Sequence, residues 1–234
     1  MMVVDDHTRM IVGARLFYQD NAANFQAVLR EAVSAYGIPE KLYVDNGSPC
    51  ANSQLSFICG SIGTVLLHTP VRDGASKGKV ERSFRTMKER WLYGLDVRQF
   101  TSLEAFNQSL QGYVRQYNLT RHSTTGQPPL ERFLQSNGHI RRPESREWLL
   151  ECFHNRIVRK VNRDATVSID SACYDVPMQF IGQKVEIRYL PGDMGDAYLL
   201  SKGIRYPLRA TNRVENGRTR RENPVSIDYG KEGD

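Results

Sequence analysis

The sequence lacks the features that would place the chain in or across a membrane. It has no run of about 18 apolar residues, the length that a membrane-spanning helix needs. Its first residues, Met-Met-Val-Val-Asp-Asp, have neither the basic region nor the apolar stretch of a secretion signal. Its four cysteines form no C-x-x-C pair and have no zinc-finger spacing with histidine. We therefore expect reduced thiols in a cytoplasmic protein that has no membrane partner.

The charge of the chain is only mildly positive, but the basic residues are clustered. Lys and Arg number 32 against 26 Asp and Glu, which gives a formal net charge of +6. Residues 71–90 and residues 141–163 each hold seven basic and three acidic side chains. Two such clusters suit a polyanion, and they are equally compatible with solvated helix faces. Hydrophobic residues make up 40% of the chain, which is enough for a packed core.

Strands alternate with helices over the first half of the chain. Apolar runs predict the strands, and apolar side chains at helical spacing predict the helices. The expected order is strand 1–4, strand 10–18, helix 22–36, strand 41–44, helix 54–62, strand 64–67, a glycine-containing loop 71–78, a long helix from residue 79, and helix 103–117. This alternation is typical of an α/β layer fold.

The composition and the hydrophobic pattern of the sequence change after Asn118. Residues 119–155 are polar and basic, and we predict a linker with helical pieces there. Residues 156–211 read as short strands separated by turns, which favours a small all-β barrel. Residues 212–234 form a polar tail. The predicted organisation is therefore an α/β domain over 1–118, the linker, the barrel and the tail.

Two carboxylates stand at positions where metal chemistry can occur. Asp45 ends the predicted strand 41–44, and Glu81 lies in the first turn of the long helix, with 35 residues between them. Carboxylates from separate elements can bind Mg²⁺ jointly, and a pair of such ions can drive an in-line displacement at phosphorus. One Asp and one Glu are too few for two ions, so a third carboxylate is expected. Each residue also has an ordinary reading, Asp45 in an Asx-turn and Glu81 at a helix N-terminus.

The surroundings of these carboxylates resemble a known family. Segment 43–48 (Tyr-Val-Asp-Asn-Gly-Ser) and segment 77–82 (Lys-Gly-Lys-Val-Glu-Arg) are similar to the second Asp and the Glu of the DDE transposases and retroviral-type integrases. Segment 4–9 (Val-Asp-Asp-His-Thr-Arg) resembles the hairpin that follows the first catalytic strand in bacterial insertion-sequence members.

Further matches follow in the order that the family has. Its catalytic domain closes on a signature that resembles Tyr117-Asn118, Arg121-His122-Ser123, Gly126, Pro129 and Phe133. Residues 156–189 are similar to the small β-barrel that follows this core in Mu-type transposases. The resemblance thus extends from about residue 3 to about residue 190, through motifs that are each weak alone.

The resemblance implies a fold, a reaction and a site. The fold would be an RNase H-like mixed sheet flanked by helices, N-terminally truncated and followed by the barrel. The reaction would be metal-dependent DNA cleavage and strand transfer, by a homo-oligomer bound to element ends and target DNA near the bacterial nucleoid. Asp45 and Glu81 would bind Mg²⁺ or Mn²⁺, and the DNA-binding residues would be Lys77, Lys79, Arg85 and Lys88.

One departure from the family affects the expected activity. The family's first catalytic Asp lies on the strand before the hairpin, and the segment from Asp5 to Asp45 is one strand too short to contain it. Asp5 and Asp6 therefore read as turn residues of the hairpin. We expect that the first strand and the N-terminal DNA-binding domain are absent and that the chain as given does not join DNA strands. The alternative function is a non-catalytic DNA-binding or assembly protein that descends from such an enzyme.

Overall fold

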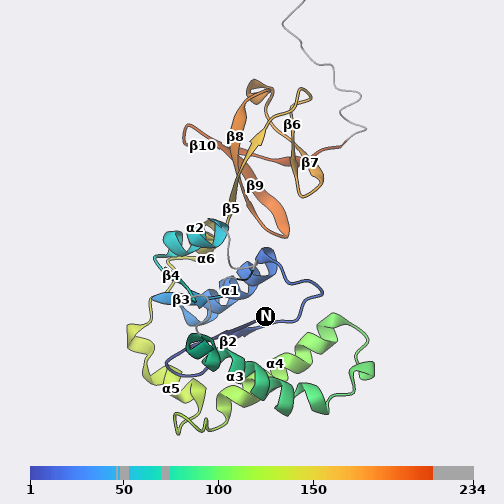
Figure 1. Ribbon diagram of the computed structural model, residues 1–234. Coiled ribbons are helices and arrows are strands. Elements are labelled where there is room, and N and C mark those ends of the chain that lie inside the picture. The colour runs from blue at the N-terminus through green and yellow to red at the C-terminus, as the bar shows by residue number, and fades with distance from the viewer. Residues whose placement is uncertain (46, 48–52, 70–73, 213–234) are drawn as a thin grey trace, which may run out of the picture. The chain divides into compact units, whose positions relative to one another are not determined.

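The computed structural model describes residues 1–45, 47, 53–69 and 74–212 (Figure 1). Contacts divide the chain into two compact units. The first is Met1–Asn155 together with Leu190–Gly192, and the second is Arg156–Tyr189 together with the residues from Asp193 onward. Among the described residues, no helix is both long enough and apolar enough to cross a membrane.

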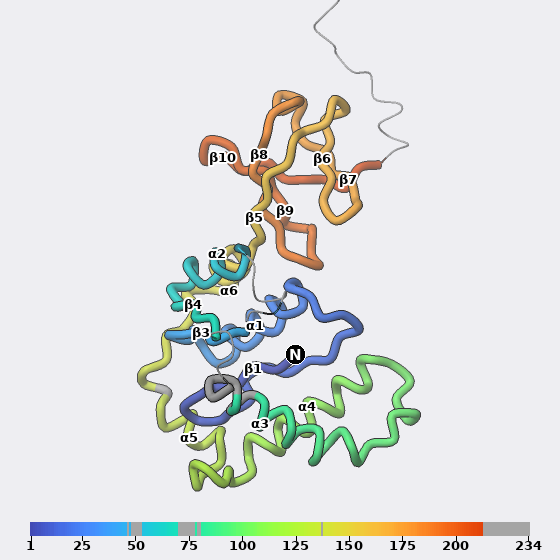
Figure 2. The backbone as a smooth tube through the Cα atoms, viewed as in Figure 1, coloured from blue at the N-terminus to red at the C-terminus, as the bar shows by residue number. Residues whose placement is uncertain are grey.

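The first unit begins with a hairpin and a helix, which Figure 2 lets the reader follow from the N-terminus. Strands β1 (Met2–Val4) and β2 (Ile11–Ala14) pair antiparallel, with Val3 opposite Gly13. Helix α1 (Ala22–Tyr36) packs closely on β2, because a Cβ atom on Gly13 would lie 2.9 Å from Val28 Cγ1. Gly13 therefore sets the distance between helix and hairpin.

A second strand pair follows α1. Strands β3 (Lys41–Val44) and β4 (Val65–His68) are parallel, and helix α2 (Ser53–Ile62) connects them. The prediction of one mixed sheet needs correction here, because the described residues form two separate two-stranded sheets, β1–β2 and β3–β4. Within the described ranges β1 pairs only with β2 and β3 only with β4, so no described strand bridges the two pairs. Apolar residues of α1, α2 and β3 share one core, which includes Leu29, Val33, Leu42, Val44, Leu55 and Ile58.

The remaining helices of the first unit follow β4. They are α3 (Gly74–Arg90), the short 3₁₀ helices η1 (Leu92–Gly94) and η2 (Val97–Gln99), α4 (Leu103–Leu119), α5 (Pro129–Gln135), the 3₁₀ helix η3 (Asn137–His139) and α6 (Arg146–Cys152). In Figure 1 the hairpin lies between α1 on one side and α3 with α4 on the other. The core on the α3–α4 side contains Ile11, Ala14, Met87, Trp91, Leu110, Val114 and Tyr117.

Helix α3 begins earlier than the sequence predicts. Residues 71–78 were expected to form a loop, but the helix already includes Gly74 to Gly78, while 71–73 lie outside the described residues. Two glycines cost a helix about 1 kcal/mol each and do not prevent it. The C-terminal turns of α3 are held in the core by Met87 and by Trp91, the residue after the helix. Helix formation can then continue from these turns toward the N-terminus, because propagation is easier than nucleation.

Residues 119–155, the expected linker, contribute to the core of the first unit. Helix α6 buries Leu149 and Cys152 against α2 and β3. The guanidinium group of Arg141 donates to the carbonyl oxygens of Ile62 and Gly63, beyond the last turn of α2. Arg142 donates to Ala35 O at the end of α1 (3.2 Å). These two cations of the second basic cluster therefore cap helix C-termini, where positive charge is favourable.

Helix α4 hydrogen-bonds to the outer edge of β2 through side-chain amides. Asn118 both accepts from Ile11 N–H (3.0 Å) and donates to Ile11 O (2.9 Å). Asn107 makes the same pair of bonds with Leu16 (2.8 and 3.2 Å). Gln111 donates to Ala14 O. These amides occupy backbone groups that would otherwise be open to another strand, so α4 protects this edge of the hairpin.

In the described part of the second unit, the regular elements are β-strands and one short 3₁₀ helix. Its elements are β5 (Asn155–Lys160), β6 (Thr166–Ile169), β7 (Ala172–Asp175), the 3₁₀ helix η4 (Met178–Phe180), β8 (Lys184–Leu190), β9 (Asp193–Ser201), β10 (Ile204–Pro207) and β11 (Arg209–Ala210). The strands form a four-stranded sheet in the order β10-β9-β8-β5 and a three-stranded sheet in the order β11-β7-β6.

The two sheets of the second unit pack around a single core. Val167 and Ile169 from the smaller sheet meet Val185, Ile187 and Leu199 from the larger one. The predicted all-β module is thus confirmed, but its strands do not close into a barrel. The reason is that the described strands pair in two groups with no hydrogen-bonded ladder between them.

Candidate metal and nucleic-acid site

Asp45 follows directly after β3, at the carboxyl end of a parallel strand pair, where ligand sites in α/β proteins gather. Its side chain is exposed, and Oδ1 accepts a hydrogen bond from the Gly47 amide (3.0 Å). The carboxylate therefore closes an Asx-turn, which is the ordinary reading of this residue, and it still faces solvent. A Cβ atom on Gly47 would lie 2.8 Å from Oδ1, so a larger residue at this position would displace the tip of the Asp45 carboxylate.

Glu81 lies on the exposed side of α3. Arg85 and Lys88 follow it at one and two turns, and all three are exposed on the same helix face. Met87 is buried on a different face of the helix. Lys77 and Lys79 belong to α3, but their side chains lie outside the described residues. The face of Glu81, Arg85 and Lys88 thus combines one carboxylate with two cations that solvent or a ligand can reach.

No group of three or more His, Cys, Asp or Glu side chains that could hold a metal ion is formed by the described part of the chain. Asp45 and Glu81 offer carboxylate oxygens, which are the donors that Mg²⁺ and Mn²⁺ prefer. Their chemistry therefore fits such an ion, and their number falls short of the set that holds two ions.

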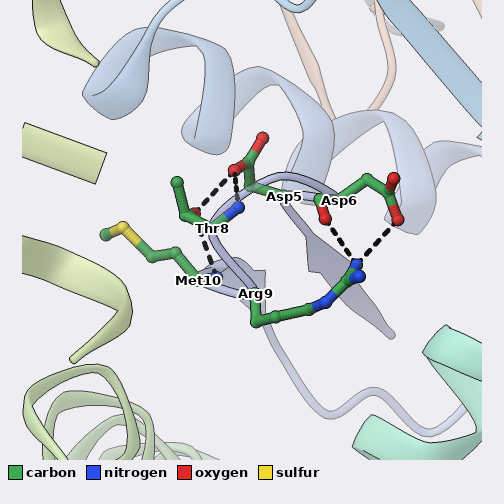
Figure 3. Close-up of polar contacts among 5 residues, drawn as sticks. All are labelled: Asp5, Asp6, Thr8, Arg9 and Met10. Atoms are coloured by element: carbon green, nitrogen blue, oxygen red, sulfur yellow. Dashed lines mark hydrogen bonds and ion pairs between the residues drawn. The ribbon is translucent and has the colours of Figure 1, made fainter. Parts of the chain in front are cut away.

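The acids of the hairpin turn are occupied by the turn itself (Figure 3). Asp5 Oδ2 accepts from the Thr8 amide (2.8 Å) and from Thr8 Oγ1 (2.6 Å). Asp6 Oδ1 forms an ion pair with Arg9 (2.8 Å), a residue whose φ of 69° is left-handed. The prediction that Asp5 and Asp6 are turn residues of the hairpin is confirmed.

The signature after α4 has structural roles that sequence reasoning did not assign. Asn118 ties α4 to the hairpin through its bonds to Ile11. Arg121 donates from Nε to the carbonyl of Gly126 (2.8 Å), a residue with a φ of 69°. The ring of Phe133 meets that of Tyr36 on α1 edge-on, with centroids 5.7 Å apart. The only sequence signal for the amide contacts was the presence of Asn and Gln on an otherwise amphipathic helix.

Cations act electrostatically on His122, a residue of the signature after α4 that was not predicted to be a site residue. The pKa of His122 is lowered from its usual 6.5, first by partial burial and then by the positive charges of Arg9, Arg90 and Arg82. The ring of Tyr117 lies edge-on to the imidazole, with centroids 6.2 Å apart. Arg9 of the hairpin turn and Arg82 and Arg90 of α3 therefore all disfavour protonation of His122.

Comparison with known proteins agrees with this architecture. A family model described as "TnsB C-terminal domain" matches residues 27–96, and one described as "Mu transposase, C-terminal" matches residues 150–206. The transposase for transposon Tn552 of Staphylococcus aureus is 26% identical over 216 residues, covering 83% of this chain and 45% of that protein. The transposase for insertion sequence IS1202 of Streptococcus pneumoniae is 25% identical over 130 residues, covering 50% of this chain and 28% of that protein.

A solved structure shows the same fold. A chain of the simian T-cell lymphotropic virus intasome, in complex with a PP2A regulatory subunit, superimposes with a TM-score of 0.51 at 17% identity. The match covers 91% of this chain and 72% of that chain. The predicted fold class, an integrase-type α/β core followed by an all-β module, is confirmed with the two corrections given above.

The two transposase family models match the two parts of this chain, one within the α/β core and one over the β module that follows it. In sequence the chain is similar to DNA transposases, as its motifs predicted. It spans less than half the length of the curated relatives it matches, 45% and 28%.

Proposed function

We propose that this chain forms the core of a DNA transposase that cuts DNA and joins strands with the help of divalent metal ions. The observation that carries the proposal is the position of the two carboxylates. Asp45 stands at the carboxyl end of β3, and Glu81 stands on the exposed face of α3, at the spacing of the family motif. The similarity to curated transposases supports the same reading.

Asp45 and Glu81 would hold Mg²⁺ or Mn²⁺. The metal would activate a water or a DNA 3′-hydroxyl and stabilise the leaving oxygen, so the reaction requires no protein nucleophile. A third carboxylate would complete the set of ligands. Because β1 and β3 each pair on one side only among the described residues, a further strand that pairs at one of these edges would be suited to carry it.

The DNA would be held by cations beside Glu81. Arg85 and Lys88 face solvent on the same side of α3, and Lys77 and Lys79 precede them in the helix. Contacts of this kind bind phosphates without reading the base sequence. The protein would act as a homo-oligomer on element ends and target DNA, in the bacterial cytoplasm.

The metal site can be tested without measuring catalysis. Fe²⁺ bound in place of Mg²⁺ reduces added H₂O₂ to hydroxide and a hydroxyl radical, ascorbate returns the resulting Fe³⁺ to Fe²⁺, and the radicals cut the polypeptide close to the ion. We expect cuts near residues 45 and 81, suppressed by excess Mg²⁺ and abolished by Asp45→Asn or Glu81→Gln. The matched control is Glu89→Gln, an exposed acid on the same helix. Cuts near Asp5 and Asp6 instead would show that the metal ligands have been assigned wrongly.

A second experiment tests the reaction. Strand joining is measured on pre-cleaved donor ends with Mg²⁺, with the 234-residue chain and with a form extended by an N-terminal strand that bears Asp. We expect joining in the extended form, and its loss in Asp45→Asn and Glu81→Gln.

A second candidate function is a DNA-binding or assembly protein without catalysis. The absence of a three-ligand metal group from the described residues favours it. In that case DNA binding would persist, while the Fe²⁺ cuts and the joining activity would be missing from both forms.

A further inference from the structure

Basic side chains from several strands meet at one end of the four-stranded sheet in the second unit. Val161, directly after β5, donates its N–H to Gln183 O (2.9 Å) and accepts from the Gly182 N–H (3.0 Å). The last two of these residues directly precede β8, so the C-terminal end of β5 lies beside the N-terminal end of β8. Lys160 ends β5 and Lys184 begins β8, and the two lysines are therefore neighbours across the sheet.

This pair of lysines points away from the core of the unit. The next residues along the chain, Val161 and Val185, are buried in that core, and successive side chains of an extended chain alternate between the two faces. Lys160 and Lys184 are both exposed. Like charges on neighbouring strands repel each other, and an anion bound between them would relieve that repulsion.

The turn between β9 and β10 lies at the same end of the sheet. Strands β8 and β9 are neighbours joined by residues 191 and 192, so they run antiparallel and the C-terminal end of β9 returns to the start of β8. The pairing of β9 with β10 leaves Lys202 and Gly203 as the turn. Lys202 is exposed and has a φ of 49°, a left-handed conformation for which such turns prefer Asn, Asp or Gly. A third lysine thus stands at the end of the sheet where the lysine pair lies.

Arg205 of β10 adds a guanidinium group to the face that carries the lysine pair. Its neighbour Tyr206 packs on the core, so Arg205 points to the opposite face. The Cζ atom of Arg205 lies 4.7 Å from the centre of the Tyr198 ring, and Arg205 remains exposed. Stacking on the ring therefore fixes the guanidinium on this face without burying it.

The acidic side chains of this sheet lie elsewhere or are already paired. In its described strands they are Glu186, Asp193 and Asp196. Glu186 accepts from Arg188 Nε (2.8 Å), and the other two lie in the first half of β9, toward the opposite end of the sheet. Asp164, in the loop after β5, accepts a hydrogen bond from the hydroxyl of a threonine two positions on (2.7 Å). The end that carries the lysines is therefore positively charged.

We propose that this basic end of the sheet is a contact surface for the phosphate backbone of duplex DNA. Its residues are Lys160, Lys184, Lys202 and Arg205. The proposal rests on the proposed function in one respect, because that function makes DNA the expected polyanion. Neighbouring strands lie about 4.8 Å apart, so the row of cations from β5 to β10 extends over about 14 Å. Duplex DNA carries one negative charge per about 1.7 Å of its axis, so such a row meets several phosphates without reading the base sequence.

The test measures duplex DNA binding in EDTA, where the metal site cannot contribute. Fluorescence anisotropy of a labelled duplex gives Kd at several salt concentrations, and each lost phosphate contact lowers the slope of log Kd against log salt by about 0.9. We expect Lys160→Gln with Lys184→Gln to lower this slope by about 1 to 2. The matched control, Arg98→Gln with Arg209→Gln, removes the same charge from exposed arginines of η2 and β11, and it should leave the slope unchanged.

A charge-conserving variant guards against a simple folding defect. Lys160→Arg with Lys184→Arg changes both side chains and keeps both charges, so its slope should equal that of the unaltered protein. A slope in the glutamine variant equal to that of the Arg98/Arg209 control would overturn the proposal. An equally lowered slope in the arginine variant would also overturn it, because charge would then not be what binds the DNA.

The outcomes also separate this proposal from the proposed function. The Fe²⁺ cuts and the joining assay test the metal site. If both fail while the Lys160/Lys184 glutamine variant still lowers the slope, the DNA surface stands and the catalytic assignment falls. If both succeed while that variant binds DNA as the control does, the DNA surface falls alone.

Discussion

Removal of the Asn118 side chain should destabilise the first unit far more than loss of an ordinary surface amide. Asn118 is buried and makes two bonds to Ile11, an acceptor contact of 3.0 Å and a donor contact of 2.9 Å. Asn118→Ala breaks both and leaves a buried N–H and a buried C=O without partners. An orphaned buried group costs about 1–3 kcal/mol. Alanine regains about 0.6 kcal/mol of helix propensity, so we expect a net loss of roughly 2–4 kcal/mol.

The loss is measurable by urea denaturation followed through tryptophan fluorescence. Trp91 and Trp148 are the two tryptophans of the chain, and both lie in the first unit. The matched control is Asn24→Ala on α1, where the side-chain amide makes one exposed bond to Gln19 O. That change should cost less than about 1 kcal/mol. Equal losses in the two variants would refute the view that α4 holds the hairpin through Asn118.

Three further predictions concern the turn after β3, His122 and the cysteines. Gly47→Ala should displace the Asp45 carboxylate, because the new Cβ would lie 2.8 Å from Oδ1, and the Fe²⁺ cuts at residue 45 should then become weaker. The control is Gly60→Ala, since no atom lies within 4 Å of a Cβ at that position. The lowered pKa of His122 means that the unfolded chain binds more protons near and below pH 6.5. Stability should therefore fall as pH drops through that range. Between pH 8 and 5.5 the urea midpoint of His122→Gln should change less than the midpoint of the unaltered protein, and an equal change in both would contradict a contribution from His122. Burial raises the pKa of the Cys59 thiol to about 11, so this thiol should react slowly at pH 8. In a Cys50→Ser variant, iodoacetamide at pH 8 should label the exposed Cys173 well before Cys59, and peptide mass mapping would show the order of labelling. Equal labelling rates in the folded protein would count against the burial of Cys59.

Elements with strong local signals could be predicted from the sequence. Helix α1 spans the predicted residues 22–36, because Asn21 accepts from the Asn24 amide at its start and Gly37 takes a φ of 107° at its end. Strand β3 also has the predicted bounds, 41–44. Asp45 and Glu81 could be selected because their neighbours in sequence form recognisable motifs. These signals act within a few residues, so they can be read without knowledge of the rest of the fold.

Features that depend on distant parts of the chain could not be predicted in this way. The start of α3 at Gly74 depends on packing of its later turns, and the separation of β1–β2 from β3–β4 depends on which edges find partners. The helix-capping roles of Arg141 and Arg142 depend on contacts across 79 and 107 positions of sequence.

The sequence by itself indicated the resemblance to transposases, the order of the main elements and the candidate metal ligands of this protein. Only the tertiary structure decided that Asn118 holds the hairpin and that the charges of Arg9 and Arg90 lower the pKa of His122. The physical reason is the range of the interactions. Capping, turn chemistry and amphipathic spacing are local properties of the chain, whereas hydrogen bonds and charge clusters between segments exist only after those segments have packed together.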